Sequence, residues 1–174
     1  MEVRRARRKV SVDGLELIGA GANGRVYRLD EDTIVKVYRP DVDADDIRRE
    51  RDFARAAFVA GVPSVSAYDV VRVGDSLGVV FEMIRSDTLG HAMRDNPDRL
   101  EEYVAKYVAL AKELHSTRVE SDALADVHDH LHALTDRLDE WCTDEEVAVM
   151  HDIVDAIPHA NTLVHNDLHP GNIM

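Results

Sequence analysis

The chain has 174 residues and a formal net charge of −13, with 45% hydrophobic and 32% charged residues. This composition excludes a wholly disordered chain and suits one ordinary domain or two small lobes. No apolar run reaches the roughly 18 residues that span a membrane, no apolar segment of a secretory signal follows the N-terminus, and the single cysteine, Cys142, allows no intrachain disulfide. We therefore expect a cytoplasmic protein with no membrane partner.

The N-terminus is basic, whereas the rest of the chain is acidic. Residues 1–9 carry five basic side chains and one acid. A nucleic-acid-binding protein needs a broad basic face, which so short a segment does not supply. We interpret residues 1–13 as a solvated basic tail and expect no nucleic-acid partner.

Residues 15–84 have the pattern of a small sheet with one helix. A short strand and a glycine turn lead to a second strand over Arg25–Leu29, and the β-branched segment Thr33–Tyr38 predicts a third. Acidic residues then begin a helix over 43–61, with Gly61 as its C-cap. This part of the chain is therefore predicted to be a small α+β lobe.

The lobe closes with a hairpin over 66–84, after which the pattern becomes helical. The hairpin turn is predicted at Gly74 and Asp75. Three helices are then predicted, over 98–117, about 122–141 and 143–156. The first has one long apolar stripe, and Thr143 with Glu146 matches a capping box at the start of the last. Residues 161–174 return to strand and loop.

The first candidate site is a glycine-rich turn. Gly19, Gly21 and Gly24 form the pattern G-x-G-x-x-G, which by itself is a weak signal. A dinucleotide site needs a helix directly after the glycines, but a strand follows here. The pattern predicts a hairpin tip at which backbone N–H groups can approach phosphates. A merely flexible hairpin turn is the alternative.

Lys36 and Glu50 form a second candidate site. Lys36 lies in the middle of a predicted strand, twelve residues after Gly24, where it can face the same cleft and pair with α- and β-phosphates. Glu50, on the following helix, can hold this lysine in place. The alternatives are a lysine that projects into solvent and a solvated glutamate.

The third candidate site is the loop "HNDLHPGN". Asp167 and Asn172 are five residues apart, with a Pro-Gly turn between them. A carboxylate can accept the proton of a substrate hydroxyl, and an amide oxygen can bind Mg²⁺. We expect His165 to support the loop through hydrogen bonds and His169 to contact phosphate or substrate. A purely structural loop is the alternative, although the spacing H-x-D-x-x-x-x-N is much more specific than the glycines.

These motifs, in this order, resemble the protein-kinase-like superfamily and, within it, the branch of aminoglycoside phosphotransferases and choline kinases. The loop resembles the H-G-D-x-H-P-G-N loop of that branch, whereas protein kinases usually carry Lys at the position of His169. The branch also inserts helices before the loop, and here fifty residues separate His115 from His165. One departure is Asn166, where the family usually has Gly, at a position that we interpret as a spacer.

The resemblance implies a two-lobed α+β fold, an antiparallel-sheet N-lobe over 14–84 and a mainly helical, incomplete C-lobe over 85–174. It implies ATP and Mg²⁺ as cofactors and transfer of the γ-phosphoryl group of ATP to a hydroxyl of a small molecule. Asp167 would be the catalytic residue and Asn172 a metal ligand. The nucleotide would be bound by the glycine tip, the Lys–Glu pair and the backbone of the inter-lobe linker, namely by Gly19, Gly21, Asn23, Gly24, Lys36, Glu50, Glu82 and Ile84.

The end of the chain departs from the resemblance. The family carries a further metal-binding Asp downstream of the loop, in a D-F-G or D-x-D-like motif, whereas this sequence ends at Met174. We therefore expect a truncated piece of a longer kinase that is a poor catalyst as it stands. The apolar surface that a truncation uncovers would favour self-association.

The sequence identifies neither the phosphoryl acceptor nor a single functional class. Residues 118–160 contain twelve acids and two arginines, which would attract a cationic substrate if they line the cleft and otherwise form a solvated acidic surface. The alternatives are a Ser/Thr protein kinase-like enzyme, a nucleotide-binding pseudokinase or regulatory module, and an interaction domain that retains the motifs as relics. His128 and His132, at i and i+4, could share a metal, with a solvated helix as the alternative.

Overall fold

The computed structural model describes residues 8–119 and 124–174. Its first half is a five-stranded antiparallel sheet with the strand order β1-β2-β3-β5-β4. The strands are β1 Leu17–Gly21, β2 Gly24–Arg28, β3 Thr33–Tyr38, β4 Ala67–Val73 and β5 Ser76–Glu82. Since β3 is the central strand and pairs with β2 and β5, the sheet fixes its position from both sides.

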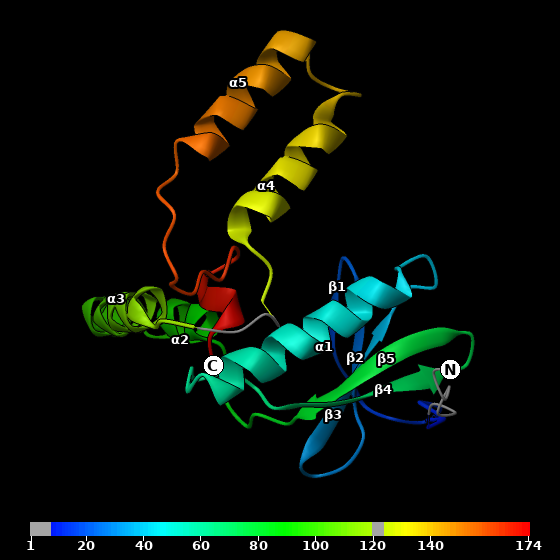
Figure 1. Ribbon diagram of the computed structural model, residues 1–174. Helices are drawn as coiled ribbons and strands as arrows, with labels where there is room; N and C mark the ends of the chain where they lie inside the picture. Colours follow the sequence, from blue (N-terminus) through cyan, green and yellow to red (C-terminus); the bar gives the residue numbers. More distant parts are fainter. Residues whose placement is uncertain (1–7, 120–123) are drawn as a thin grey trace.

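Helix α1 (Ala44–Val59) lies across one face of this sheet (Figure 1). The core between them holds Tyr38 and Phe81 from the sheet and Ile47 from the helix, which is 1% exposed. Complete burial of a side chain such as Ile47 contributes about 1.5–3 kcal/mol. The N-cap Asp43, whose side chain accepts from the N–H of Asp45, starts the helix, and the packing holds α1 in a fixed position over the β4 and β5 part of the sheet.

The opposite face of the sheet is covered by the N-terminal segment. Val35 and Val71 are fully buried there, and Val10 and Val12 pack against them. The N–H of Val10 donates to the carbonyl oxygen of Arg72 at 2.9 Å. The prediction of a solvated tail needs correction only at Val10 and Val12, which pack against apolar strand residues. Arg8, Lys9 and Ser11 are exposed, and residues 1–7 lie outside the described part.

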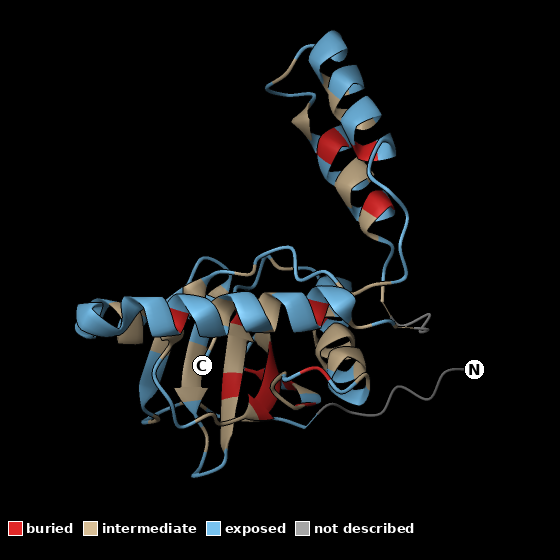
Figure 2. Ribbon diagram, turned by 90° about the vertical axis from the view of Figure 1, so that its left-hand side faces the viewer, coloured by how far each residue is buried: buried red, intermediate tan, exposed pale blue. Residues whose placement is uncertain are grey.

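The second half is helical. Its elements are α2 Leu89–Asp95, α3 Leu100–Ser116, α4 Val127–Thr135 and α5 Asp144–Asp155, with short 3₁₀ turns η1 Pro97–Arg99, η2 Asp136–Leu138 and η3 Pro170–Asn172. Helices α4 and α5 lie side by side and project away from the sheet (Figure 1). The residues that they bury lie along the seam between them (Figure 2). None of the helices in the described residues is long and apolar enough to cross a membrane.

The observed elements confirm the predicted α+β class. The strand predicted over Thr33–Tyr38 has the predicted bounds, and the capping box at the start of α5 is present. Helix α1 ends one residue before its C-cap Ala60, so Gly61 follows the cap, with a left-handed φ of 82°.

The expectations for the second half need correction at three points. Helix α2 was not predicted, because it is too short to show a clear period. The helix predicted about 122–141 is α4 followed by a 3₁₀ turn, and its residues 120–123 lie outside the described part. The final strand is only an isolated bridge, between Arg118 and Thr162.

The apolar stripe predicted on α3 is present but largely uncovered. Leu114 is buried, whereas Leu100, Val104 and Val108 are between 41% and 48% exposed. Exposed apolar surface of this kind is what self-association would require, and self-association remains a prediction.

Candidate active site

The glycine tip joins β1 to β2. Gly21 and Gly24 face each other in the register, and the carbonyl oxygen of Asn23 accepts a hydrogen bond from the N–H of Arg39 at 3.1 Å. A Cβ at Gly24 would lie 2.2 Å from the carbonyl oxygen of Val37, whereas a Cβ at Gly21 would meet nothing within 4 Å. The fold therefore requires a glycine at 24, whereas it would accommodate a Cβ at 21.

Lys36 lies next to this tip. It pairs with Val26 across the β2–β3 ladder, which puts it two residues, or roughly 7 Å along the strand, from Gly24. Its Nζ donates to the Glu50 carboxylate at 2.7 Å. Both side chains are only partly buried, so their ion pair contributes at most about 1 kcal/mol to stability. The more important effect of the ion pair is that it holds the Lys36 ammonium group in a defined position.

Tyr38 is a further residue of this cluster, and the sequence analysis missed it. The Lys36 ammonium lies 4.8 Å from the centroid of the Tyr38 ring, and this residue is 3% exposed. Burial, followed by the nearby Glu50 charge, raises the pKa of the Tyr38 hydroxyl above its ordinary value. The hydroxyl makes no hydrogen bond to any of the described residues. Its position two residues after Lys36, on the same face of β3, was the available signal.

The end of β5 and the residues after it contain the predicted adenine contacts. The N–H of Glu82 donates to the Ser66 carbonyl at 2.9 Å, and the N–H of Met83 donates to the Asp32 carbonyl at 2.8 Å. The Glu82 carboxylate accepts from the Ser66 hydroxyl at 3.0 Å, so it is turned toward the protein. Adenine contacts through the backbone of Glu82 and Ile84 remain a prediction.

The loop around Asp167 is held by the two helices beneath it. The Tyr107 hydroxyl, on α3, donates to the carbonyl oxygen of Leu168 at 2.7 Å. At the start of α2, the N–H of Leu89 donates to the carbonyl oxygen of Ile173, also at 2.7 Å. Helix α2, which was not predicted, thus has a clear structural role: it fixes the far end of the loop.

Within the loop, Asn172 is bonded to Asp167. Its Nδ2 donates to the Asp167 backbone oxygen at 2.9 Å and to Oδ2 at 3.0 Å. Because the amide nitrogen makes both bonds, the amide oxygen points away from Asp167. A carboxylate and an amide oxygen are ligand types that Mg²⁺ accepts, so the donor set fits this ion.

Asn166 has a backbone role that the sequence analysis did not recognise. Its φ is 61°, the one positive φ at a non-glycine position in the described residues. Glycine adopts this region freely, and asparagine is among the few other residues that adopt it often. Our interpretation of position 166 as a spacer was therefore wrong: the turn requires a residue that tolerates a left-handed backbone.

The two loop histidines make local contacts. Nδ1 of His165 accepts from the N–H of Asp167 at 3.3 Å, which is the supporting contact expected of it. Nδ1 of His169 accepts from the N–H of Gly171 at 3.0 Å. The neutral His169 ring then carries its proton on Nε2, which lies 3.9 Å from Oδ2 of Asp167.

The structure places the predicted catalytic, lysine and metal-ligand residues in two clusters. One is formed by Lys36 and Glu50 beside the glycine tip, and the other is the loop around Asp167. Among residues 8–119 and 124–174, no hydrogen bond or ion pair links Lys36 or Glu50 to the loop.

The histidines of α4 do not share a site. His132 contacts His151 of α5, with 2.7 Å between their Nδ1 atoms, whereas His128 contacts Ile157 and Asp126. The solvated-helix alternative was also wrong for His128, which is 8% exposed.

Comparison with known proteins places the chain in a family. A family model described as the phosphotransferase enzyme family (APH) matches residues 14–174. The chain belongs to this family. The match confirms the resemblance on which the sequence motifs were interpreted, because it includes the glycine tip, Lys36 and the loop to its end.

The chain is also similar to solved structures, among them that of the streptomycin–ATP–APH(2″)-IIa ternary complex. The identity is 22% and the TM-score 0.40, over 81% of this chain and 52% of that one. The chain thus spans about half the length of that protein. No curated protein matches it.

Proposed function

We propose that this member of the phosphotransferase family uses ATP as phosphoryl donor and a hydroxyl group of a small molecule as acceptor. The observation that carries the proposal is the Lys36–Glu50 ion pair of 2.7 Å beside the glycine tip. The pair adds little to stability, and it holds a cation where the phosphates of a nucleotide would lie.

The donor half of the proposed site binds ATP. The residues of the tip, Gly19, Gly21, Asn23 and Gly24, would cover the phosphates with backbone N–H groups. Lys36 would pair with the α- and β-phosphates, and Glu50 would keep its ammonium group in position. The Glu82 carbonyl and the Ile84 amide would contact the adenine.

The acceptor half of the proposed site activates the hydroxyl. Asp167 would orient the hydroxyl and accept its proton as the oxygen attacks the γ-phosphorus and the bond to the ADP oxygen breaks. The Asn172 amide oxygen would hold Mg²⁺, which when bound neutralises charge on the phosphates. Tyr107, through Leu168, would keep the loop in place. Most of the rate would come from positioning and charge stabilisation.

We also propose that the acceptor is cationic. The support is the excess of acids over residues 118–160, which includes the three acidic residues in the first turn of α5. A negative surface raises the local concentration of positively charged ligands. A cytoplasmic location remains a prediction.

Phosphoryl transfer with labelled ATP and Mg²⁺ tests the proposal directly. A panel of hydroxyl-bearing amines is compared with neutral polyols and with serine peptides. We expect transfer to the amines, and we expect Asp167→Asn to abolish it while ATP affinity is kept. Asp98→Asn, at an exposed position outside residues 118–160, is the control. Transfer to peptides alone would favour a protein kinase, and ATP binding without any transfer would favour a regulatory module.

A further inference from the structure

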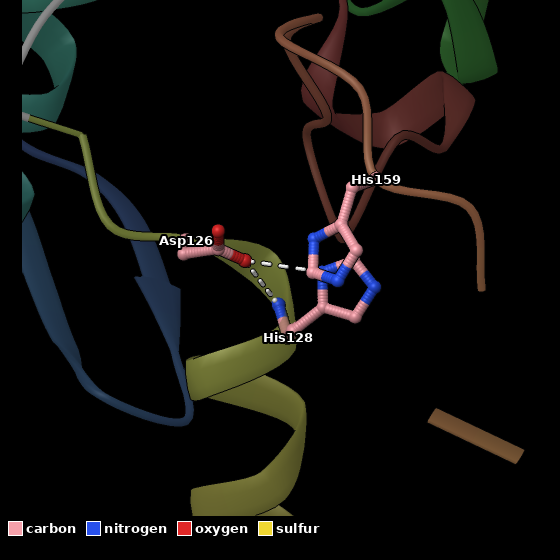
Figure 3. A group of neighbouring side chains, drawn as sticks. All are labelled: Asp126, His128 and His159. Atoms are coloured by element: carbon pink, nitrogen blue, oxygen red, sulfur yellow. Dashed lines mark hydrogen bonds and ion pairs between the residues drawn. The ribbon is translucent and has the colours of Figure 1, made fainter. Parts of the chain in front are cut away.

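A second polar cluster lies at the base of the α4–α5 arm, outside the proposed active site. It consists of Asp126, His128 and His159 (Figure 3). One ligand atom of each side chain lies within 4.8 Å of the other two. Asp126 is the N-cap of α4 and His128 is in its first turn, whereas His159 comes after the end of α5. The cluster therefore joins the start of one helix to the end of the other.

His128 has a defined orientation in this cluster. It is 8% exposed, and its Nε2 lies 3.0 Å from the carbonyl oxygen of Ile157. A carbonyl oxygen accepts but cannot donate, so Nε2 carries a proton. A histidine that ligates a metal typically donates its other ring N–H to such a carbonyl, which fixes the tautomer. Nδ1 of His128 is thereby directed at the rest of the cluster.

A cation is required between His128 and Asp126. Nδ1 of the neutral His128 ring has a lone pair, and it lies 3.1 Å from the carboxylate Oδ1 of Asp126. Two electron-rich atoms repel each other at this distance unless a proton or a metal ion lies between them. The Asp126 carboxylate cannot turn away freely, because Oδ1 also accepts the N–H of His128 at 2.8 Å and so caps the helix.

The position of His159 favours a metal ion over a proton. A proton would need only His128 and Asp126, whereas a metal ion can use a third ligand beside them. The ring of His159 is stacked on that of His128, with 3.9 Å between their centroids, and Figure 3 shows the two rings beside the Asp126 carboxylate. His159 is exposed, so its side chain can rotate to direct a nitrogen at the ion without movement of the core.

We propose that Asp126, His128 and His159 bind one divalent transition-metal ion of the Zn²⁺ class. Two imidazoles and one carboxylate suit Zn²⁺ and related ions, with a fourth position for water. Mg²⁺ prefers oxygen ligands, so this site is chemically distinct from the proposed Mg²⁺ site at Asn172. The ion would act as a clip that ties the end of α5 to the start of α4.

The neighbouring histidine pair does not have the same properties. His132 and His151 are joined by a short contact between their Nδ1 atoms, and their Nε2 atoms face Asp155 and Asp136. Each Nε2 atom faces a different carboxylate, and the pair is not part of a group of three possible ligands among the described residues. The pair provides a control with the same residue types on the same two helices.

Cobalt titration of the full chain tests the proposal, because tetrahedral Co²⁺ has intense visible absorption bands. We expect one Co²⁺ per chain, displaced by Zn²⁺ and not by Mg²⁺. His159→Ala should weaken binding by more than the roughly 10–100-fold that loss of an outer-shell partner causes. Asp126→Asn should also weaken it while helix α4 is kept, because asparagine is an equally good N-cap.

Two control variants locate the ion. His130→Ala, at an exposed position on α4, and His151→Ala should both retain binding. The proposal is overturned if the folded wild-type chain takes up no Co²⁺ or Zn²⁺, since a proton then fills the gap. It is equally overturned if His159→Ala binds as the wild type does, or if only His151→Ala loses the ion.

Discussion

The two halves of the proposed active site are held in different ways. Lys36 is on the central strand of a sheet, with paired strands on both sides and a helix packed above it. The loop around Asp167 is largely exposed, and its main supports are single hydrogen bonds from Tyr107 and Leu89. Substitutions near Lys36 should therefore act first on stability, whereas those around the loop should act first on catalysis.

The largest expected effect is that of Gly24→Ala. The new Cβ would lie 2.2 Å from the backbone oxygen of Val37, and β2 cannot move away without loss of its ladder. We expect the free energy of unfolding to fall by about 3 kcal/mol, at the upper end of the usual cost of overpacking. Urea unfolding followed by circular dichroism measures the change.

Gly21→Ala is the matched control, since its Cβ meets nothing within 4 Å. We expect its stability to stay within about 0.5 kcal/mol of the wild type while its ATP affinity falls. Equal destabilisation by the two substitutions would show that the glycine tip serves the fold and not a ligand.

Tyr107→Phe tests the support of the loop. The substitution removes the donor to the Leu168 carbonyl, and we expect a loss of about 1 kcal/mol of stability. Phosphoryl transfer should fall more than ATP affinity, because the loop positions Asp167, whereas the proposed ATP contacts come from Lys36 and the glycine tip. Tyr103→Phe, on the same helix, is the control, and an equal fall of transfer in both variants would contradict this role of Tyr107.

Substitutions at Asn166 change only a backbone preference, so their effect on stability should be no larger than that of Tyr107→Phe. Its φ of 61° costs most L-residues roughly 1–2 kcal/mol. We expect Asn166→Ala to lower the free energy of unfolding by about 1 kcal/mol and Asn166→Gly to leave it nearly unchanged. Thermal unfolding of both variants measures the difference, and equal values would mean that the left-handed turn is not maintained in solution.

The contrast between the packed strand that carries Lys36 and the exposed loop around Asp167 also explains what could be predicted from the sequence. Strand Thr33–Tyr38 was predictable because β-branched residues and a following proline mark it locally. The ion pair between Lys36 and Glu50 was predictable only as one of two alternatives. The register of β3 and the placement of α1 decide whether the two side chains meet. These depend on packing between segments that are distant in sequence.

The supports of the loop could not be predicted for the same reason. Tyr107 and Leu168 are 61 residues apart, and His128 and His159 are 31 apart. Nothing in the local pattern of either residue indicates its partner. Asn166 is a different case: the family's glycine at this position was a sufficient signal, and we interpreted it as a spacer instead of a requirement for positive φ.

Calorimetry of Mg²⁺-ATP binding to the wild-type chain and to Lys36→Ala tests the central claim most directly. Lys106→Ala, which removes an exposed lysine of α3, is the control. We expect the wild type and the control to bind ATP and the Lys36 variant to lose most of its affinity. Equal binding by all three proteins, or none by a folded wild-type chain, would contradict the assignment of Lys36 and the glycine tip to a nucleotide site.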